Sequence, residues 1–563
     1  MNPAQLLDHL DRISDAPEAI PRLRRFILDL AIRGKLVEQD AKDEPASELH
    51  RRILAEKVCL IKTGDIRKQE SLPLSEDEEP FGIPYNWIWV RLGYIGDWGS
   101  GSTPPRGNDE YYGKGITWLK SGELNDNQQL RGSEENVTEL ALRKCSFRRN
   151  QRGDVLIAMY GATIGKVAIL AEPAVTNQAV CGCTPFGGVL NRYLFTFLLS
   201  QRAQFHSMSE GGAQPNISKA KILGFPFPFP PLAEQRRIVA KVDELMGLCD
   251  RLEAAQAERE SRRDRLSAAS LNCLNQPADD PSVFQESARF YFNHLPRLTT
   301  STEHIKLLRK TILNLAVRGK LVPQDRNDES IAKRLTLSDQ TRQAIAKEDR
   351  RADADSQTLL AAEDRWVVPA SWDWRGLADL VLFIDYRGQT PNKVEQGVRL
   401  ITAKNVKKGF INLSPEEFLT EANYHTWMRR GFPKAGDVLF TTEAPMGNCA
   451  VVRLPERFAL AQRVICFRPY GSVDPDFLVL QLLSMPFQFI LDKTATGLTA
   501  KGIKAAKLKR LPVAVPPLAE QQRVVAKADE LMALCDRLET QLTTTQTESR
   551  RLLETVLHDA LTC

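Results

Sequence analysis

The segment PPLAEQRRIVAKVDELMGLCDRLE at residues 230–253 occurs again as PPLAEQQRVVAKADELMALCDRLE at residues 516–539, and 20 of the 24 positions are identical. A second pair of segments, LRRFILDLAIRGKLV at 23–37 and LRKTILNLAVRGKLV at 308–322, is identical at 11 of 15 positions. The two copies lie 286 residues apart in the first pair and 285 residues apart in the second. Because the offsets agree, both pairs belong to one tandem duplication of the chain.

The sequence between the repeated segments diverges, although its landmarks keep their order. GDVLIAMYGATIGKVAIL at 153–170 corresponds to GDVLFTTEAPMGNCAVV at 436–452. Single residues also correspond in pairs: Trp87 and Trp89 with Trp372 and Trp374, Gln178 with Gln462, and Ile217 with Ile503. Two nearly identical frames therefore enclose two divergent variable blocks. This contrast indicates that the frames meet equivalent partners, or each other, and that the blocks recognise different things.

The repeated segments have the apolar spacing of long helices. Steps of 4, 3, 4 and 3 residues, the seam of a coiled coil, separate Ile238, Val242, Leu245, Cys249 and Leu252, and again Val524, Ala528, Leu531, Cys535 and Leu538. Paired prolines at 230–231 and 516–517 suit the first turn of a helix. Roughly 40 helical residues would span about 60 Å. We expect two antiparallel long helices that bury each other's seams and serve as a spacer; the alternative is that they are core helices of a bundle.

The variable blocks contain short β-rich runs between Gly, Pro and Asn turns, with a helical pattern at 189–206 and 474–491. The predicted fold is α+β: two mixed α/β domains separated by long antiparallel coiled-coil-like helices, with an internal pseudo-twofold from the duplication. The predicted parts are a helical frame segment at 1–82, the first variable block at 83–229, a long helix at 230–275, a linker at 276–300, a second frame segment at 301–365, the second variable block at 366–515 and a long helix at 516–563.

Composition is typical of a globular protein, with 42% hydrophobic and 26% charged residues. The chain has no apolar run of about 18 residues and no secretory signal at its start, so we expect a cytoplasmic protein without a membrane contact. Ten cysteines are scattered, and reduced thiols are the expectation. Cys181 and Cys183 form an isolated C-x-C that alternation along a strand explains better than zinc. No metal site is predicted.

Positive charge is concentrated in the variable blocks. Residues 83–229 carry 15 basic and 11 acidic side chains, and residues 366–511 carry 20 and 13, which gives net charges of +4 and +7. The rest of the chain sums to −6. Two separated basic blocks are expected if each meets phosphate, although an excess of this size is weak evidence alone.

The motif P-P-L-x-E-Q after a short strand, twice in one chain around two variable blocks, resembles the specificity subunits of type I restriction-modification systems. The R-G-K-L-V element before each block resembles a subgroup with an extra helical segment there, and the resemblance covers essentially the whole chain. It implies that each variable block is a target recognition domain for one half of a bipartite site in double-stranded DNA. It also implies that the repeated helices dock two methyltransferase subunits, that restriction/translocase subunits join the complex, and that S-adenosylmethionine, ATP and Mg belong to those partners, with no cofactor in this chain.

A search for catalytic motifs agrees with a non-catalytic subunit. The chain contains no N-P-P-[FYW] or F-x-G-x-G segment of an adenine methyltransferase and no H-E-x-x-H. GATIGK at 161–166 has three residues between its glycines where a phosphate loop has four, and lacks the following Ser or Thr, so a tight strand turn is the better interpretation. Two alternatives stay open: the recognition part of a self-contained restriction enzyme, and a coiled-coil scaffold that binds only proteins.

Candidate DNA-contacting residues are those that can pair with base edges or phosphates and that lie on predicted turns. In the first block they are Ser102, Thr103, Arg106, Lys120, Tyr160, Thr163, Lys166, Gln178, Asn216, Lys219 and Lys221. In the second they are Arg387, Gln389, Thr390, Lys393, Lys404, Asn405, Lys407, Lys408, Thr441, Thr442, Asn448, Arg463, Lys501 and Lys504. The alternative for each is a solvated charge or a turn-forming polar group. Trp87 and Trp372 are expected to anchor cores.

Overall fold

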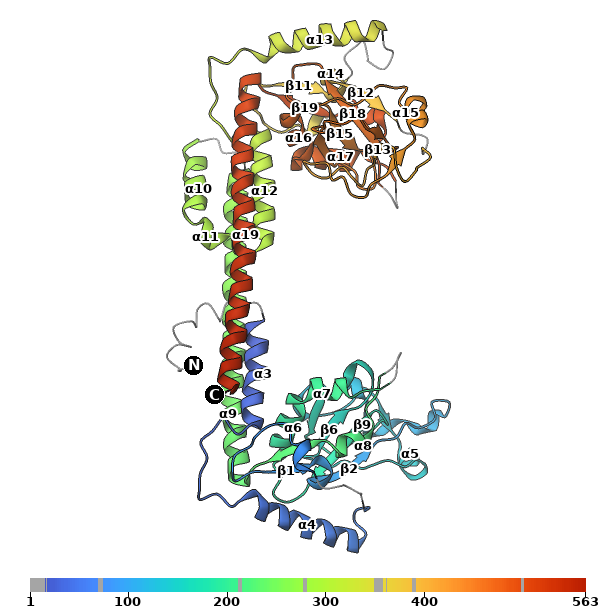
Figure 1. Cartoon of the computed structure of the whole chain (residues 1–563), viewed down its shortest axis with the longest axis vertical. Helices are drawn as coiled ribbons and strands as arrows, with labels where there is room; N and C mark the ends of the chain where they lie inside the picture. The colour runs from blue at the N-terminus through green and yellow to red at the C-terminus, as the bar shows by residue number, and fades with distance from the viewer. Residues whose placement is uncertain are drawn as a thin grey trace. The chain divides into compact units, whose positions relative to one another are not determined.

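The computed structural model describes residues 16, 18–68, 74–210, 215–276, 281–348, 358–360, 362–386, 391–497 and 501–562. The chain divides into two compact units. Unit 1 contains residues 1–258 with 546–563, and unit 2 contains residues 259–545. Each unit holds one variable block with its sheets, and each is flanked by long helices (Figure 1).

The variable block of unit 1 contains three sheets. Its main sheet has the strand order β2-β9-β6-β7-β4, a smaller sheet has the order β5-β3-β8, and β1 pairs with β10. Antiparallel pairing joins β2, β9, β6 and β7, whereas β8 lies parallel to β3. The strands are β1 Ile88–Arg91, β2 Gly96–Ser100, β3 Tyr112–Leu119, β4 Asn127–Leu130, β5 Asn136–Val137, β6 Val155–Ala158, β7 Val167–Leu170, β8 Val175–Thr176, β9 Val180–Pro185 and β10 Pro226–Phe229.

The variable block of unit 2 repeats this topology, except that its described residues hold no counterpart of β4, which lies parallel to β7 in unit 1. Its sheets have the orders β12-β18-β15-β16, β14-β13-β17 and β11-β19, and β17 lies parallel to β13 as β8 does to β3. The strands are β11 Asp373–Gly376, β12 Val381–Asp385, β13 Val398–Ile401, β14 Phe418–Leu419, β15 Val438–Thr441, β16 Cys449–Val451, β17 Ala459–Leu460, β18 Val464–Pro469 and β19 Pro512–Val515. Two divergent sequences thus form one fold, because their alternating apolar positions coincide.

Helices cover each block in the same order. In unit 1 they are α3 Ala19–Ile32, α4 Ala46–Thr63, α5 Glu139–Lys144, α6 Asn191–Ser200, α7 Arg202–Ser207, α8 Lys219–Leu223 and α9 Leu232–Asn275. In unit 2 they are α12 Thr302–Val317, α13 Ile331–Glu348, α14 Leu377–Leu380, α15 Glu421–Trp427, α16 Pro475–Leu483, α17 Met485–Thr494, α18 Ala505–Leu508 and α19 Leu518–Thr562. The interval 276–300, expected as a linker, includes α10 Pro281–Asn293 and α11 Leu295–Leu298.

In unit 2, α12, the start of α19 and the end of α9 form a helical bundle. Leu271, Leu308, Ile312, Ala528 and Cys535 are buried together in its core. His304 contacts Asp264 of α9 at 2.8 Å and Arg309 pairs with Asp536 of α19 at 2.6 Å. Further along the chain, Asn314 of α12 contacts Asn275 at the C-terminal end of α9, and Gln324, which follows α12, contacts Glu520 at the N-terminal end of α19. The end of α9 is therefore parallel to α12, and the start of α19 is antiparallel to both.

Unit 1 has the corresponding bundle, in which α3 packs on the start of α9 and on the end of α19. Arg24 pairs with Asp250 at 2.7 Å, and Arg22 pairs with Glu554 at 2.7 Å. Ala19 is buried with Leu553 and Val556 of α19. Each long helix thus contributes to both units.

The seam residues face the interior of these bundles. Fully or nearly fully buried are Ile238, Val242, Cys249, Val524, Ala528 and Cys535, whereas Leu245, Leu252, Leu531 and Leu538 are half-buried. The expected antiparallel long helices are present, and a third helix, α3 or α12, also covers part of each seam. This happens because α3 and α12 carry apolar stripes of their own, including Ile27, Leu28, Ile305 and Leu308.

Candidate nucleic-acid interface

Each variable block is attached to its long helix by a buried carboxylate in the repeated P-P-L-A-E-Q segment. Glu234 accepts hydrogen bonds from Trp87 Nε1 at 2.9 Å and from Gln39 Nε2 at 2.5 Å. Glu520 accepts the corresponding bonds from Trp372 Nε1 and Gln324 Nε2 at the same distances. Both glutamates are 1% exposed. Burial raises the pKa of both carboxyl groups, while the donors beside them act in the opposite direction.

The glutamine that follows fixes the block's first long helix. Gln235 donates to the carbonyls of Gly188 and Pro230 and accepts from Leu190 N at 2.7 Å, at the residue that precedes α6. Gln521 makes the same three contacts, with Ser472, Pro516 and Asp474. Sequence reasoning identified Trp87 and Trp372 as core anchors but missed these glutamates and glutamines. Both residues repeat in the two copies, but nearly every other polar residue of the segment repeats as well, so the sequence held no signal that singled them out.

Backbone hydrogen bonds gather the predicted DNA-contacting loops of the first block. Gly101 N donates to Val180 O, and Asn177 N donates to Leu119 O, so the loop after β2 and the turn after β3 meet the β8–β9 turn. Met159 N donates to Ala179 O, and Ile217 N donates to Met159 O. The segments around residues 102, 120, 160, 178 and 217, which are scattered in sequence, therefore lie at one edge of the block.

The same connections recur in the second block. Thr442 N donates to Arg463 O at 3.0 Å and Ile503 N donates to Thr442 O at 3.1 Å. Ala461 N donates to Ile401 O at 2.9 Å, which brings in the turn after β13. The two blocks thus present equivalent loops with different side chains.

The structure places the predicted residues of the first block at or near the surface. Thr103, Arg106, Gln178, Asn216 and Lys219 are exposed, and half-buried are Ser102, Lys120, Tyr160, Thr163, Lys166 and Lys221. GATIGK forms the turn between β6 and β7, as the tight-turn interpretation predicted. Cys181 and Cys183 are buried on β9, in agreement with strand alternation.

The predicted residues of the second block are divided between surface and interior. Exposed are Lys393, Lys404, Lys408, Arg463, Lys501 and Lys504, Lys407 is half-buried, and the interior holds Asn405, Thr441, Thr442 and Asn448. Arg387, Gln389 and Thr390 lie outside the described residues.

The four interior side chains hold turns in place. Asn405 accepts from Thr402 N and donates to the carbonyls of Asn412 and Pro415. Asn448 donates to Val406 O, and its backbone N–H bonds Thr441 Oγ1. Thr442 Oγ1 donates to Arg463 O. Because these groups are buried and internally satisfied, they are removed from the set of DNA-contacting side chains. Their residue types, Asn and Thr, predicted base contacts, but the same residue types also stabilise turns.

Several surface cations pair with carboxylates of their own block. Arg106 lies 2.7 Å from Glu135, Lys221 lies 2.6 Å from Glu210, and Lys120 lies 3.0 Å from both Glu134 and Glu135. In the second block, predicted residues form the pairs Lys393–Glu417 at 2.8 Å, Lys501–Asp492 at 2.7 Å and Arg463–Glu443 at 3.5 Å. The hydrogen bonds from Arg106 and Lys120 lower the pKa of Glu135.

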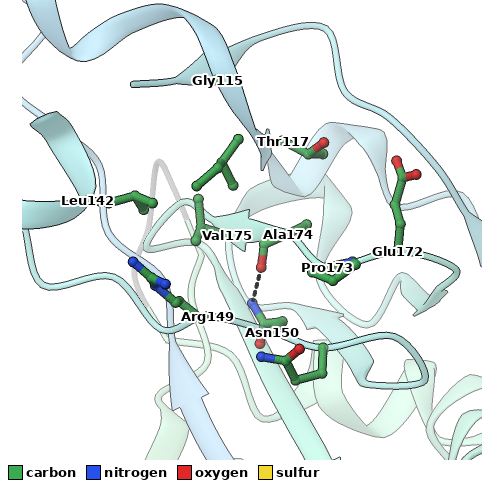
Figure 2. Close-up of a pocket in the computed structure, with 11 residues that line it drawn as sticks. Gly115, Thr117, Leu142, Arg149, Asn150, Glu172, Pro173, Ala174 and Val175 are labelled. Carbon is green, nitrogen blue, oxygen red and sulfur yellow. Dashed lines mark hydrogen bonds between the residues drawn. The ribbon is translucent and has the colours of Figure 1, made fainter. Parts of the chain in front are cut away.

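A separate pocket of about 530 Å³ lies beside the small sheet of the first block (Figure 2). Arg149, Asn150, Glu172 and Thr117 line it, and none of the predicted DNA-contacting residues does. Over the ranges that the structure describes, no group of three or more His, Cys, Asp or Glu side chains is placed to hold a metal ion. Within the same ranges, no helix is long and apolar enough to cross a membrane.

Comparison with known proteins places the chain in a family. The family model of the type I restriction modification DNA specificity domain matches residues 84–259 and 391–545. The EcoAI specificity subunit of Escherichia coli is 30% identical over 551 residues, covering 92% of this chain and 90% of that protein. The EcoEI specificity subunit of Escherichia coli is 27% identical over 570 residues, covering 96% and 94%. A chain from a structure on assembly and conformational transition of the type I system aligns with a TM-score of 0.49 at 18% identity, covering 86% and 99%. This chain belongs to the specificity subunits of type I restriction enzymes and carries their DNA specificity domain twice.

Proposed function

We propose that each variable block binds one half of a bipartite site in double-stranded DNA, as the non-catalytic specificity subunit of a type I restriction-modification complex. One observation carries the proposal. Apart from β4, the two blocks have the same strand order, and they have the same buried attachment to the frame, whereas the side chains on their gathered loops differ. A fixed scaffold with changed surface groups is what recognition of two different half-sites requires.

The exposed and half-buried candidates support this function chemically. Lysines such as Lys219, Lys404, Lys408 and Lys504 suit phosphate contacts, which set affinity and position. Arg106, Gln178 and Asn216 can form paired hydrogen bonds with guanine or adenine edges. Net charges of +4 and +7 on residues 83–229 and 366–511 favour both kinds of contact.

The frames are proposed to dock two methyltransferase subunits, and restriction/translocase subunits would join that complex. The partners would bind S-adenosylmethionine, ATP and Mg, and a DNA substrate implies action in the cytoplasm. Since the seams are buried within this chain, docking falls on outward-facing side chains of the frame. Leu248 on α9, 45% exposed, is one such apolar residue. We expect Leu248→Asp to weaken co-purification with the methyltransferase, and Leu140→Asp, which alters a 39% exposed leucine on α5, to leave it intact.

The half-site assignment is tested by exchanging one block at a time. Replacing residues 83–229 with the block of another family member, and residues 366–515 in a second variant, should each change a different half of the methylated motif. Methylome sequencing of cells that carry the complete complex reads out both halves. A change in both halves from one exchange would contradict the assignment. Methyl transfer by the purified chain with S-adenosylmethionine alone would instead support the self-contained enzyme. A chain that assembles but shows no salt-dependent DNA binding would support the protein scaffold.

A further inference from the structure

The two variable blocks share a short loop motif that survives their divergence. Thr103-Pro104-Pro105-Arg106 in the first block corresponds to Thr390-Pro391-Asn392-Lys393 in the second. Each motif ends in a cation, and each cation is accessible: the side chain of Arg106 is 57% exposed and that of Lys393 is 46% exposed. Both loops precede the central strand of the small sheet, β3 or β13.

Each of these cations is bound by a glutamate at the same place in the fold. Arg106 Nη1 lies 2.7 Å from Glu135, and Lys393 Nζ lies 2.8 Å from Glu417. Glu135 directly precedes β5, and Glu417 directly precedes β14, the strands that pair antiparallel with β3 and β13. The two ion pairs therefore occupy equivalent places, although the surrounding sequences differ and Glu135 also lies 3.0 Å from Lys120.

The glutamate backbones are fixed by the sheet. Trp118 N donates to Glu135 O in the first block, and Leu400 N donates to Glu417 O at 2.7 Å in the second. The carboxylates are also less exposed than their cations, with 34% of the Glu135 side chain and 18% of the Glu417 side chain accessible. Each carboxylate thus lies on a rigid strand flank, and the cation in front of it faces solvent.

Aromatic side chains hold the first loop from the other side. Trp118 Nε1 donates to Ser102 O at 3.1 Å, and Tyr112 Oη donates to Pro104 O at 2.7 Å. The Arg106 guanidinium lies 4.8 Å from the centre of the Tyr112 ring and 5.2 Å from that of Trp118. Rings and carboxylate together fix the guanidinium in one orientation. In the second block, Val394 N donates to Phe418 O and ties the loop to β14.

We propose that Glu135 and Glu417 are positioning residues for DNA recognition: each holds the loop cation in its binding orientation until an acceptor of the DNA, a phosphate or a base edge, replaces the carboxylate. The inference rests on the proposed function. An exposed ion pair adds little to folding stability, so equivalence in two divergent blocks is better explained by a role in binding. The carboxylate also masks one positive charge, which limits attraction to DNA of any sequence.

The test uses the full chain assembled with its methyltransferase subunits, and short duplexes that carry the cognate site or one substituted half-site. The variants are Glu135→Gln, Glu135→Asp and Glu417→Gln. Glu139→Gln, at an exposed glutamate in the first turn of α5 of the same block, is the matched control. Dissociation constants are measured from 50 to 200 mM salt, and thermal unfolding reports whether each variant keeps its fold.

In Glu135→Gln, affinity for every duplex should fall more steeply with salt, with an added loss of about three- to fourfold over this range. The reason is that Arg106 loses its carboxylate partner and becomes free to contact DNA, whereas Lys120 keeps Glu134. If the acceptor is a base edge, discrimination at the half-site of the first block should also fall by about fivefold or more, with the other half-site unchanged. If the acceptor is a phosphate, discrimination should stay constant. Glu135→Asp, which retains the charge, should restore wild-type behaviour in part, and Glu417→Gln should produce the same changes for the second half-site.

Wild-type salt dependence and discrimination in both glutamine variants would overturn the inference, whatever their thermal stability. That result would leave the proposed function intact, because the wild-type complex would still bind its site. Absence of sequence-specific binding by the wild-type complex would instead refute the proposed function. Equal effects from Glu139→Gln would also overturn the inference, since they would show that any lost carboxylate suffices.

Discussion

The frames and the variable blocks of this chain diverged to very different degrees, and burial explains the difference. Buried frame contacts recur unchanged: Trp87 Nε1 donates to Glu234 at 2.9 Å, and its counterpart Trp372 Nε1 donates to Glu520 at 2.9 Å. In the blocks, the strand order recurs while the loop side chains change. A buried polar contact is costly to alter because one changed partner leaves the other unsatisfied, whereas an exposed loop side chain is replaced at little cost.

One frame contact breaks this rule and gives the largest expected difference between the copies. Lys57 on α4 donates to Gly93 O at 2.9 Å, whereas its counterpart Arg342 on α13, 3% exposed, lies 3.0 Å from Asp339 and 3.6 Å from the buried Asp379. Arg342→Ala should lower the free energy of unfolding by about 3–5 kcal/mol because it breaks a buried ion pair. Lys57→Ala should cost only about 1–2 kcal/mol. Urea unfolding of the full chain measures the loss of unfolding free energy in each variant. Equal losses would show that the ion pair of Arg342 contributes no more stability than the hydrogen bond of Lys57.

The attachment carboxylates should behave alike in the two copies. Glu234→Ala and Glu520→Ala each remove the acceptor of a buried tryptophan N–H and a glutamine amide. We expect each to lower the free energy of unfolding by about 2–4 kcal/mol. The glutamine variants retain an acceptor and should cost less than about 1.5 kcal/mol. Urea unfolding again measures the effect, and a large difference between the copies would contradict their equivalence.

The glycines that end α3 and α12 provide a sharper comparison. Gly34 and Gly319 have φ of +68° and +67°, and an added Cβ would lie 2.4 Å from Pro84 or Pro369. Alanine at either position should cost about 1–3 kcal/mol in thermal unfolding, from backbone strain and the proline clash together. Gly64 is the matched control, since its φ is +82° but a Cβ would meet no atom within 4 Å. Gly64→Ala should therefore report the strain alone, and an equal cost at all three would exclude the clash.

The smallest expected effect is a pH dependence shared by both frames. Burial raises the pKa of Glu234 and Glu520 above the ordinary value of 4.5. At pH values between 4.5 and the raised pKa, the folded chain therefore binds more protons than the unfolded chain. The stability that these groups contribute is lost as the pH rises through that window. The double variant Glu234→Gln with Glu520→Gln should lose less stability than wild type as the pH rises above about 4.5. Identical profiles of unfolding free energy would contradict the shift.

Much of the fold could be predicted because it depends on patterns that the duplication displays twice. The 4-3 spacing from Ile238 to Leu252 predicted a long helix, and the paired tryptophans predicted core anchors; both predictions are confirmed. The third helix over each seam was missed. Periodicity identifies a helix's apolar face but not the element that covers it.

The DNA-contacting residues could be predicted only in part, since residue type does not determine exposure. Arg106 and Asn405 could both contact bases by their chemistry. The Arg106 side chain is exposed, whereas Asn405 is buried and its amide is hydrogen-bonded within the block. Glu135 was missed because a single glutamate has no signature. The acidic pairs Glu134-Glu135 and Glu416-Glu417, each before a short strand, were a repeated signal that comparison of the two copies could have found.

Because α19 contributes to both units, unit 1 cannot finish packing when its own block has been translated. Residues 546–562 of α19 complete the bundle of unit 1, through Glu554 on Arg22 and the Leu561 carbonyl on Lys35. All 287 residues from 259 to 545 must be translated before that segment emerges. At ribosomal rates of roughly 5–20 residues per second, this takes about 15–60 s. The first unit therefore stays incompletely packed until residues 546–562 have been translated.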